Sequence, residues 1–446
     1  MDTKALRQKI LDLAIHGKLV PQDPNDEPAS VLLERIRTEK ERLIKEGKIK
    51  KGKKSAKTSD KPHYPYELPK GWEWTTLGDC IYVKSGTSIN VRNNQTGCVP
   101  IYGGNGINGY CSTPNVEKTT IVIGRVGFNC GSVHFVKEKA WVTDNAFITT
   151  IIGKGYTEEF LLYLLEQLNL KKYANSTAQP VISGAKIYPI TVPLPPYAEQ
   201  QRIVNAIKIS LSLINIVENG KEELQTSIKR AKSKVLDLAI HGKLVPQDPN
   251  DESASELLKR INPKAEIISD NGHYQNLPKG WCLVKGKYIF NQMKSCKPIG
   301  ETFKYIDIDA IDNKRQIISN LKILKVANAP GRASRFTQKG DVVFSLVRPY
   351  LRNIAIVSEN DCIASTGFYV CHPTEVLLPK YCYHLMISDY VINGLNEFMK
   401  GDNSPSINKG DIDNWLFPIP PLAEQKRIVS KIEEIFAQLD AIETAL

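Results

Sequence analysis

The sequence predicts an α+β protein in which two domains are separated by an antiparallel, coiled-coil-like spacer of long helices, with cyclic pseudo-twofold symmetry. A seventeen-residue stretch, LDLAIHGKLVPQDPNDE, begins at Leu11 and is repeated without change from Leu236. A second pair, PLPPYAEQQRIVNAI from Pro193 and PIPPLAEQKRIVSKI from Pro418, recurs after the same 225 positions. Twice that period is 450, close to the chain length of 446 residues, so the repeat nearly closes into a ring.

Composition is that of an ordinary globular chain, with 41% hydrophobic residues. The N-terminal stretch lacks the apolar run of a secretory signal, and no segment approaches the roughly 20 apolar residues of a membrane span. We therefore expect a cytoplasmic protein with no membrane partner. The nine cysteines form no C-x-x-C pair, which argues against a zinc site or a redox dithiol and favours reduced structural thiols.

A net charge of +11 suggests nucleic-acid binding, because clustered Lys and Arg displace counterions from phosphates. Eleven Lys or Arg and four acids fall between Arg37 and Lys61, so +7 of this charge lies in one short segment. Such a run is typical of a solvated linker, and sequence-independent phosphate contact is the alternative.

The N-terminal segment, 1–61, is expected to be helical before this basic linker. Leu6, Ile10 and Leu13 follow the spacing of a helix that packs on another helix, and Gly17 marks its end. Ser30 is a candidate cap for a second helix, VLLERIRTEKERLIKEG.

The segments 62–196 and 271–421 are expected to be the two α+β domains. Each has LPKGW near its beginning, at Leu68 and at Leu277. The first contains strand-like runs TIVIGRVG, SVHFV and AFITTII and a helix at 158–169. The second contains GDVVFSLVR and a strand over CIASTGFYV. The motifs that flank the two domains match, but the sequences inside the domains share little similarity.

The central segment, 197–270, contains a helical tract over about 198–241, whose apolar residues recur three and four apart. The C-terminal segment, 422–446, repeats this pattern and is expected to pair with the N-terminal helix to complete the second half of the spacer. Asn219 and Gly220 interrupt the central tract, and we expect it to bend or fray there.

No catalytic motif is legible. Leu194-Pro195-Pro196-Tyr197 approaches an amino-methyltransferase signature, but its first residue cannot accept a hydrogen bond from an amine. No phosphate-binding P-loop follows any Gly-Lys pair, and the glycines of YGGNGINGY lack the context of a dinucleotide fingerprint, so we interpret them as loop glycines. His16 and His241 have no second ligand at metal spacing and fit helix-terminal roles. We therefore expect a protein without catalytic or metal residues.

Binding remains. The stretch 331–353 combines arginines with aromatic residues, a combination suited to phosphate contact and guanine recognition, although a solvated strand face is the alternative. The candidate DNA-binding residues of the second domain are Arg332, Arg335, Arg348, Tyr350, Arg352 and Lys409. Those of the first domain are Lys84, Arg125, Asn129, Gln179 and Lys186.

The doubled arrangement of LPKGW, a divergent domain, P-x-P-P-x-A-E-Q-x-R-I-V and HGKLVPQDP resembles the specificity subunit of type I restriction-modification systems over essentially the whole chain. The resemblance implies two target-recognition domains that each read one half of a bipartite site on double-stranded DNA. It also implies helices that dock two modification (methyltransferase) subunits, and restriction subunits in the same complex. This chain would bind no cofactor, since S-adenosylmethionine, ATP and magnesium would belong to those partners. Candidate partner-binding residues are Gln200, Arg202, Gln425, Arg427, His16 and His241.

Two alternatives stay open. The partner could be an enzyme that fuses restriction and modification in one chain. Alternatively, the protein could be a coiled-coil scaffold with two protein-binding domains. The basic insert before the first domain has no counterpart before the second, so the two linkers are expected to differ.

Overall fold

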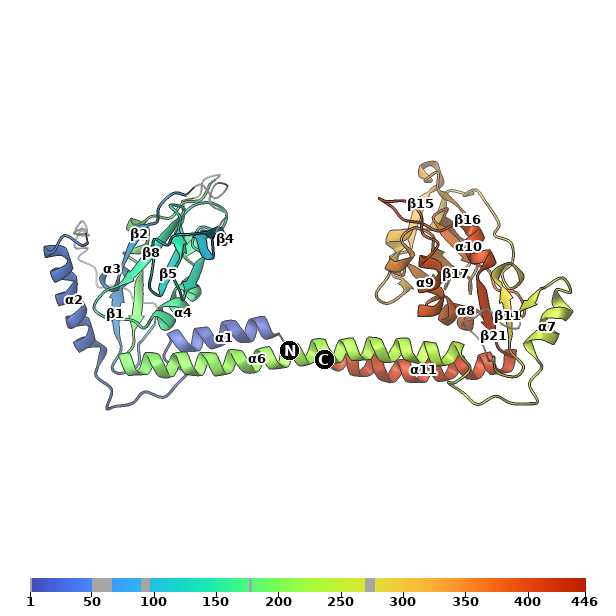
Figure 1. Cartoon of the computed structure of the whole chain (residues 1–446), viewed down its shortest axis with the longest axis horizontal. Helices are drawn as coiled ribbons and strands as arrows, with labels where there is room; N and C mark the ends of the chain where they lie inside the picture. The colour runs from blue at the N-terminus through green and yellow to red at the C-terminus, as the bar shows by residue number, and fades with distance from the viewer. Residues whose placement is uncertain (1, 50–65, 90–96, 176–178, 269–276) are drawn as a thin grey trace. The chain divides into compact units, whose positions relative to one another are not determined.

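The computed structural model describes residues 2–49, 66–89, 97–175, 179–268 and 277–446. The chain divides into two compact units, Met1–Gly220 and Lys221–Leu446. Each unit contains long helices and an α+β domain (Figure 1). The boundary between the units falls inside the expected central segment, within one helix.

Unit 1 is framed by two antiparallel helices. Its helices are α1 (Thr3–Ile15), α2 (Ala29–Lys45), α3 (Leu77–Cys80), α4 (Glu158–Leu168), η2 (Leu170–Tyr173), α5 (Gly184–Ile187) and the first half of α6 (Tyr197–Ile240). Near the start of α1, Arg7 pairs with Glu218 at 2.6 Å, whereas beyond its end Gln22 reaches Glu199. Helix α1 therefore runs antiparallel to this part of α6 (Figure 1).

The predicted helices are largely confirmed. Helix α1 ends before Gly17, whose φ of +64° suits a glycine. Helix α6 is one element of 44 residues that continues through Asn219 and Gly220, so the expected interruption is wrong. A glycine inside a helix costs only about 1 kcal/mol, which a long helix can absorb.

Helix α2 confirms the predicted second helix, but its start differs from the expectation. Pro28 is its N-cap residue, so Ser30 lies in the first turn and does not cap the helix. The helix buries Leu32, Leu33 and Ile36 and extends to Lys45, so the basic segment that begins at Arg37 starts within this helix. Residues 50–61 lie outside the described part of the chain.

The domain of unit 1 is built from three sheets. Its strands are β1 (Glu73–Thr76), β2 (Ile81–Ser85), β3 (Val99–Gly103), β4 (Gly106–Cys111), β5 (Thr120–Gly124), β6 (Val133–Val136), β7 (Trp141–Val142), β8 (Ala146–Ile151) and β9 (Thr191–Leu194). The first and last strands, β1 and β9, pair antiparallel, and the other sheets have the orders β2-β8-β5-β6 and β4-β3-β7. The YGGNGINGY glycines belong to the β3–β4 hairpin: Gly104 lies in its turn, as expected of a loop glycine, whereas Gly103, Gly106 and Gly109 lie in the strands, so their interpretation as loop residues is corrected.

The core of unit 1 joins this domain to its helices. Phe160, Leu161, Leu164 and Leu165 of α4 are fully buried against the main sheet and the frame helices. The cluster also includes Ile10 of α1, Ile36 of α2 and Ile203 of α6. The helices and the domain therefore fold as one body within the unit.

Unit 2 repeats the frame with the second half of α6. Its helices are α7 (Ala254–Ile261), η3 (Gly286–Tyr288), η4 (Ile308–Ala310), η5 (Val326–Asn328), η6 (Pro349–Leu351), α8 (Pro379–Met386), α9 (Asp389–Asn396), α10 (Lys409–Asn414) and α11 (Leu422–Ala445). Helix α11 is antiparallel to α6, since Arg427 contacts Asp251 just beyond α6 while the C-terminal Leu446 carbonyl accepts from Lys221 at 2.7 Å.

The sheets of unit 2 differ from those of unit 1. Its strands are β10 (Ile267–Ile268), β11 (Cys282–Lys285), β12 (Thr302–Ile306), β13 (Ile311–Asp312), β14 (Ile317–Ile318), β15 (Lys322–Lys325), β16 (Ala333–Thr337), β17 (Val342–Ser345), β18 (Ile354–Ile356), β19 (Cys362–Ser365), β20 (Phe368–Cys371) and β21 (Leu416–Ile419). Strand β11 pairs with the last strand, β21, as β1 does with β9, but the largest sheet has the order β15-β12-β19-β16 and a parallel β12–β19 pair. The expected strand CIASTGFYV is two strands in different sheets, β19 and β20, because the chain turns at Thr366 and Gly367.

Candidate functional sites

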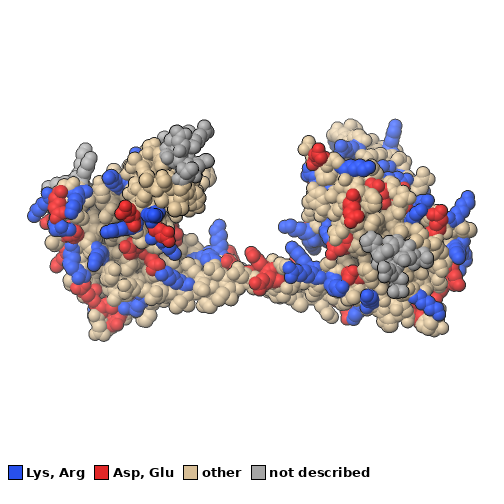
Figure 2. Space-filling model, in the orientation of Figure 1, with Lys and Arg blue, Asp and Glu red and all other residues tan. Residues whose placement is uncertain are grey.

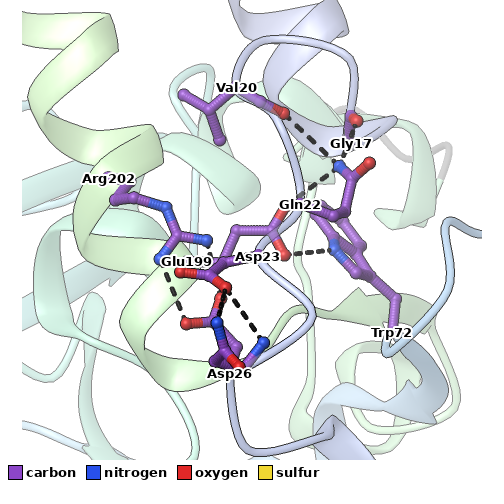
Figure 3. Close-up of polar contacts among 9 residues, drawn as sticks. Gly17, Val20, Gln22, Asp23, Asp26, Trp72, Glu199 and Arg202 are labelled. Atoms are coloured by element: carbon purple, nitrogen blue, oxygen red, sulfur yellow. Dashed lines mark hydrogen bonds and ion pairs between the residues drawn. The ribbon is translucent and has the colours of Figure 1, made fainter.

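The repeated sequence motifs meet at one place in each unit. In unit 1 the buried carboxylate of Glu199 accepts hydrogen bonds from the Trp72 indole at 2.9 Å and from Gln22 at 3.1 Å (Figure 3). Gln22 also donates to the Gly17 carbonyl at 2.7 Å. A Cβ atom on Gly17 would lie 2.4 Å from Pro69, so the glycine is needed for close packing. We call this meeting point of HGK, LPKGW and AEQ the junction.

The junction of unit 2 has the same geometry. Glu424 accepts from Trp281 at 2.9 Å and from Gln247 at 3.0 Å, and Gln247 donates to the Gly242 carbonyl at 2.7 Å. A Cβ atom on Gly242 would lie 2.3 Å from Pro278. Because the same contacts occur twice, packing inside each unit accounts for the identity of the residues that make them, including the glycine and the glutamine of each repeat.

Ion pairs complete both junctions. Arg202 binds both carboxylate oxygens of Asp26 at 2.6 and 3.1 Å, and Arg427 binds Asp251 at 2.6 and 3.4 Å. These hydrogen bonds raise the pKa of both arginines. Burial raises the pKa of Glu199 above its usual value, and the bonds from Gln22 and Trp72 oppose that shift.

Gln200 and Gln425 were expected to contact a partner, but both are fully buried. The Gln200 amide accepts from Thr157 N at 2.8 Å and donates to the carbonyls of Gly155 and Pro195 at 2.9 and 3.1 Å. Gln425 repeats this pattern: its amide accepts from Leu378 N at 2.8 Å and donates to the carbonyls of Val376 and Pro420 at 2.8 and 3.0 Å. Their expected role is therefore corrected: each glutamine fixes its domain to its frame helix and has no surface to offer.

The other candidate partner residues are partly accessible. The side chains of Arg202 and Arg427 are 37% and 35% exposed despite their ion pairs. His16 and His241 are 27% and 33% exposed, and in each the Nδ1 atom lies 2.7 Å from a carbonyl four residues earlier. The histidines thus lie at the ends of α1 and α6, and their contact with a partner stays a prediction.

In unit 1 the candidate DNA-binding residues lie on neighbouring segments. Arg125, just after β5, donates to Ser85 at 3.2 Å and to the Asp144 carbonyl, and its guanidinium lies 5.5 Å from the centre of the Phe147 ring. Lys84 is exposed beside Ser85 on β2. The β5–β6 loop that Arg125 begins therefore lies at the same end of the sheet as Lys84.

The remaining candidate DNA-binding residues of unit 1 lie in the β5–β6 loop or in segments close to it. Asn129 donates to Asn105 of the β3–β4 turn. Gln179 precedes Pro180, whose carbonyl accepts from Gly127 within the loop. Lys186 is exposed on α5, which packs beside β2. The sequence did not single out Phe128, which is 80% exposed at the tip of the loop, although its place between glycine and asparagine was a signal.

In unit 2 Arg332 and Arg348 line one cavity of about 430 Å³. The cavity is also lined by Asn353, Ser365 and the acids Asp307 and Asp309, so it presents both donors and acceptors. Arg348 has a φ of +48° and donates to the Asn403 carbonyl at 2.8 Å. Its strained backbone is held by a hydrogen bond from its amide to Pro405.

The other unit 2 candidates have different surroundings. Tyr350 is 45% exposed on η6, between two positive-φ arginines. Arg352 is turned inward: it binds Asp389, which also accepts from Ser233 of α6. This makes Arg352 a link between the η6 turn and the frame helix.

Two further candidates of unit 2 lie on its strands and short helices. Arg335 is half-buried on β16, and its Nε atom has no hydrogen-bond partner among the described residues. Lys409 begins α10 and pairs loosely with Asp413 at 3.7 Å. Lys409 lies three residues beyond Ser406, which bridges to Val347 beside Arg348.

Lys and Arg side chains are distributed over the visible faces of both units and alternate with Asp and Glu (Figure 2). Across the described ranges, no group of three or more His, Cys, Asp or Glu residues is arranged to hold a metal ion. None of the described helices combines the length and the apolar character needed to span a bilayer. All nine cysteines are free thiols.

The fold and the junctions define a class of protein: a tandem molecule with a duplicated helical frame and two different domains. The family described as type I restriction modification DNA specificity domain matches residues 69–226 and 282–446. The chain belongs to this family and carries two of its domains, as the sequence motifs predicted.

Proteins similar in sequence and in structure support this family assignment. The EcoAI specificity subunit of Escherichia coli is 28% identical over 97% of this chain and 88% of its own length. The EcoEI specificity subunit of the same species is 26% identical over 99% and 90%. A solved HsdS subunit from Thermoanaerobacter tengcongensis has the same fold, with a TM-score of 0.50, 18% identity and coverage of 85% of this chain and 93% of its own. The chain is a type I specificity subunit with two target-recognition domains.

Proposed function

We propose that each unit reads one half of a bipartite site on double-stranded DNA, and that the frame helices bind two methyltransferase subunits. The observation that carries this proposal is that the two junctions share the same hydrogen bonds while the sheets differ. Matching junctions give two domains the same support, while different sheets and loops present different side chains to different base pairs. A subunit whose domains recognise DNA and whose helices bind partners needs no catalytic residue of its own.

The proposed DNA-binding surfaces are supported by Lys and Arg hydrogen-bond donors at the loops and strand ends of both domains. In unit 1 the Arg125 loop and the Lys84 strand gather donors at one end of the main sheet. In unit 2 the cavity of Arg332 and Arg348 offers two guanidinium groups that suit guanine O6 and N7 or a phosphate. Arg352 supports this surface through Asp389 and is proposed to position the turn.

The partner surface is supported by an apolar stripe on α6. Ile209, Leu213 and Ile216 are 63%, 58% and 63% exposed, and their spacing of four and three places them on one face of the helix. This stripe begins near a cavity of about 510 Å³ that includes Gln201 and Asn205 of the same helix. An apolar stripe on a helix fits the amphipathic helix of a partner.

The equivalent face of unit 2 is more polar. The positions 225 residues later are Glu434, Gln438 and Ala441 on α11. We therefore propose that the two partner subunits make chemically different contacts with the two frames. S-adenosylmethionine, ATP and magnesium are assigned to the methyltransferase and restriction partners, which would act with this chain in the cytoplasm. A partner that fuses restriction and modification would use the same surfaces.

The test is selection of duplexes from a random library by the full-length chain, alone and with its methylating partner. We expect an enriched motif of two short specified parts separated by unspecified base pairs, because the two units would read separate half-sites. A single continuous motif, or no enrichment in either preparation, would contradict the proposal. Capture of proteins without DNA enrichment would instead favour the scaffold alternative.

A further inference from the structure

The β5–β6 loop of unit 1 presents an aromatic ring to solvent. Phe128 lies at its tip with 80% of its surface exposed. Transfer of an apolar ring out of water is favourable, so the exposed ring of Phe128 is available to pack against a ligand.

The loop cannot fold back to cover the ring without breaking hydrogen bonds. Gly127 N donates to the Pro180 carbonyl at 2.9 Å, and Gly131 N donates to Gly124 at 2.8 Å. Ile182 N donates to the Arg125 carbonyl at 2.9 Å, which fixes the base of the loop. Gly131 has a φ of +84°, and a Cβ atom there would lie 2.5 Å from the backbone of η2. The backbone therefore holds Phe128 in its exposed position.

The surroundings of the ring are cationic. The Lys171 ammonium lies 4.2 Å from the centre of the Phe128 ring, and Lys172 is the next residue of η2. Arg125 stands at the base of the loop. Neither the loop, RVGFNCG, nor η2, LKKY, contains an acidic residue. An exposed ring bordered by cations fits a nucleobase attached to phosphates better than an apolar protein surface.

We propose that Phe128 is a specificity-determining residue that stacks on, or wedges beside, a base in the half-site of unit 1, while Lys171 binds the adjacent phosphate. The proposal rests on the DNA-reading function proposed above and names the residue that contacts a base face. An inserted ring favours steps that unstack readily, such as pyrimidine–purine steps, so it adds selectivity without hydrogen bonds. Unit 2 has a chemical counterpart in Tyr350, which is exposed between two arginines.

The test compares variants of the full-length chain on duplexes selected by the wild-type chain, with the duplex half assigned to unit 1 by domain exchange. Phe128→Ala is expected to weaken binding roughly 5- to 100-fold, the range for loss of one stacked base. Phe128→Trp should retain binding, and Phe128→Leu should fall between them. Val31→Ala, which changes an exposed apolar residue on α2 of the same unit, should leave affinity unchanged.

A second measurement follows the base itself. A series of duplexes, each with 2-aminopurine at one position of the unit 1 half-site, should show a change in fluorescence on binding for only one position. Phe128→Ala should abolish that change. Failure of the wild-type chain to bind DNA selectively would refute the proposed function. Selective wild-type binding that Phe128→Ala alters by less than about twofold would refute only the role of Phe128. Loss of partner binding with intact DNA binding would also overturn it, since the ring would then face a protein.

Discussion

Gln200 offers the sharpest test of how the recognition domain of unit 1 is fixed to its frame. Its fully buried amide makes three hydrogen bonds, with Thr157 N, Gly155 O and Pro195 O. Gln200→Ala would leave one buried N–H and two buried carbonyls without this partner. At about 1 kcal/mol for each of the three lost bonds, we expect a loss of roughly 3 kcal/mol from the free energy of unfolding of unit 1.

The assay is thermal unfolding combined with hydrogen exchange. For a unit of about 220 residues, this loss corresponds to a fall in Tm of roughly 6–12 °C. Hydrogen exchange should locate the effect at the start of α4, where Thr157 N would exchange faster. Gln201→Ala is the matched control, because Gln201 is the exposed neighbour on the same helix. A change below about 1 kcal/mol for Gln200→Ala, or an equal change for Gln201→Ala, would refute the reasoning.

Three further predictions concern ionisation, DNA and partners. Because burial raises the folded-state pKa of Glu199, the contribution of this residue to the free energy of unfolding is fully present below the usual pKa of a glutamate and is lost as pH rises through the raised value. Glu199→Gln should remove this component of the pH dependence in urea titrations from pH 4 to 8. Arg348→Ala should lower the slope of log affinity against log salt by about 1, whereas Arg352→Ala should mainly destabilise the η6 turn, as hydrogen exchange can show. Changing Ile209 and Leu213 to Ser should weaken binding of the methylating partner in co-purification without changing Tm, and unchanged partner binding would contradict the docking surface.

The frame could be predicted from sequence because its signals are local and repeated. Gly17 ends α1 as a glycine in the left-handed region does, and the three-and-four spacing from Ile203 to Ile214 marks the side of α6 that faces α1 and the domain. The shared period of 225 identified the duplication without knowledge of any contact.

The roles within the junction could not be predicted. Identity of the AEQ-x-R motifs suggested a surface shared with partners, yet Glu199 and Gln200 are buried and bound within the unit. Sequence identity reports a shared constraint, and internal packing imposes one as strictly as a partner does. The polar character of glutamine gave no sign of its burial, because two of the three backbone groups that satisfy the Gln200 amide, Thr157 N and Gly155 O, lie more than forty residues earlier in the sequence.

The proposed DNA-binding surfaces could be predicted only in part, because the orientation of their side chains depends on the tertiary structure. The arginines of 331–353 were found as a cluster, but only the fold shows that Arg348 borders a cavity while Arg352 turns toward Asp389. Phe128 was missed because exposure of an aromatic side chain follows from the anchoring of its loop. The β19–β20 boundary was missed for a similar reason, since a continuous apolar run does not reveal a change of sheet.

The central claim is that the two units read separate halves of one DNA site. Its most direct test is to exchange residues 62–196 for the corresponding domain of a related specificity subunit and to map methylated adenines in cells that also carry the methylating partner. If each unit reads its own half-site, one half of the bipartite motif changes while the other half stays as in the wild type. A motif altered in both halves, or unaltered in both, would contradict it.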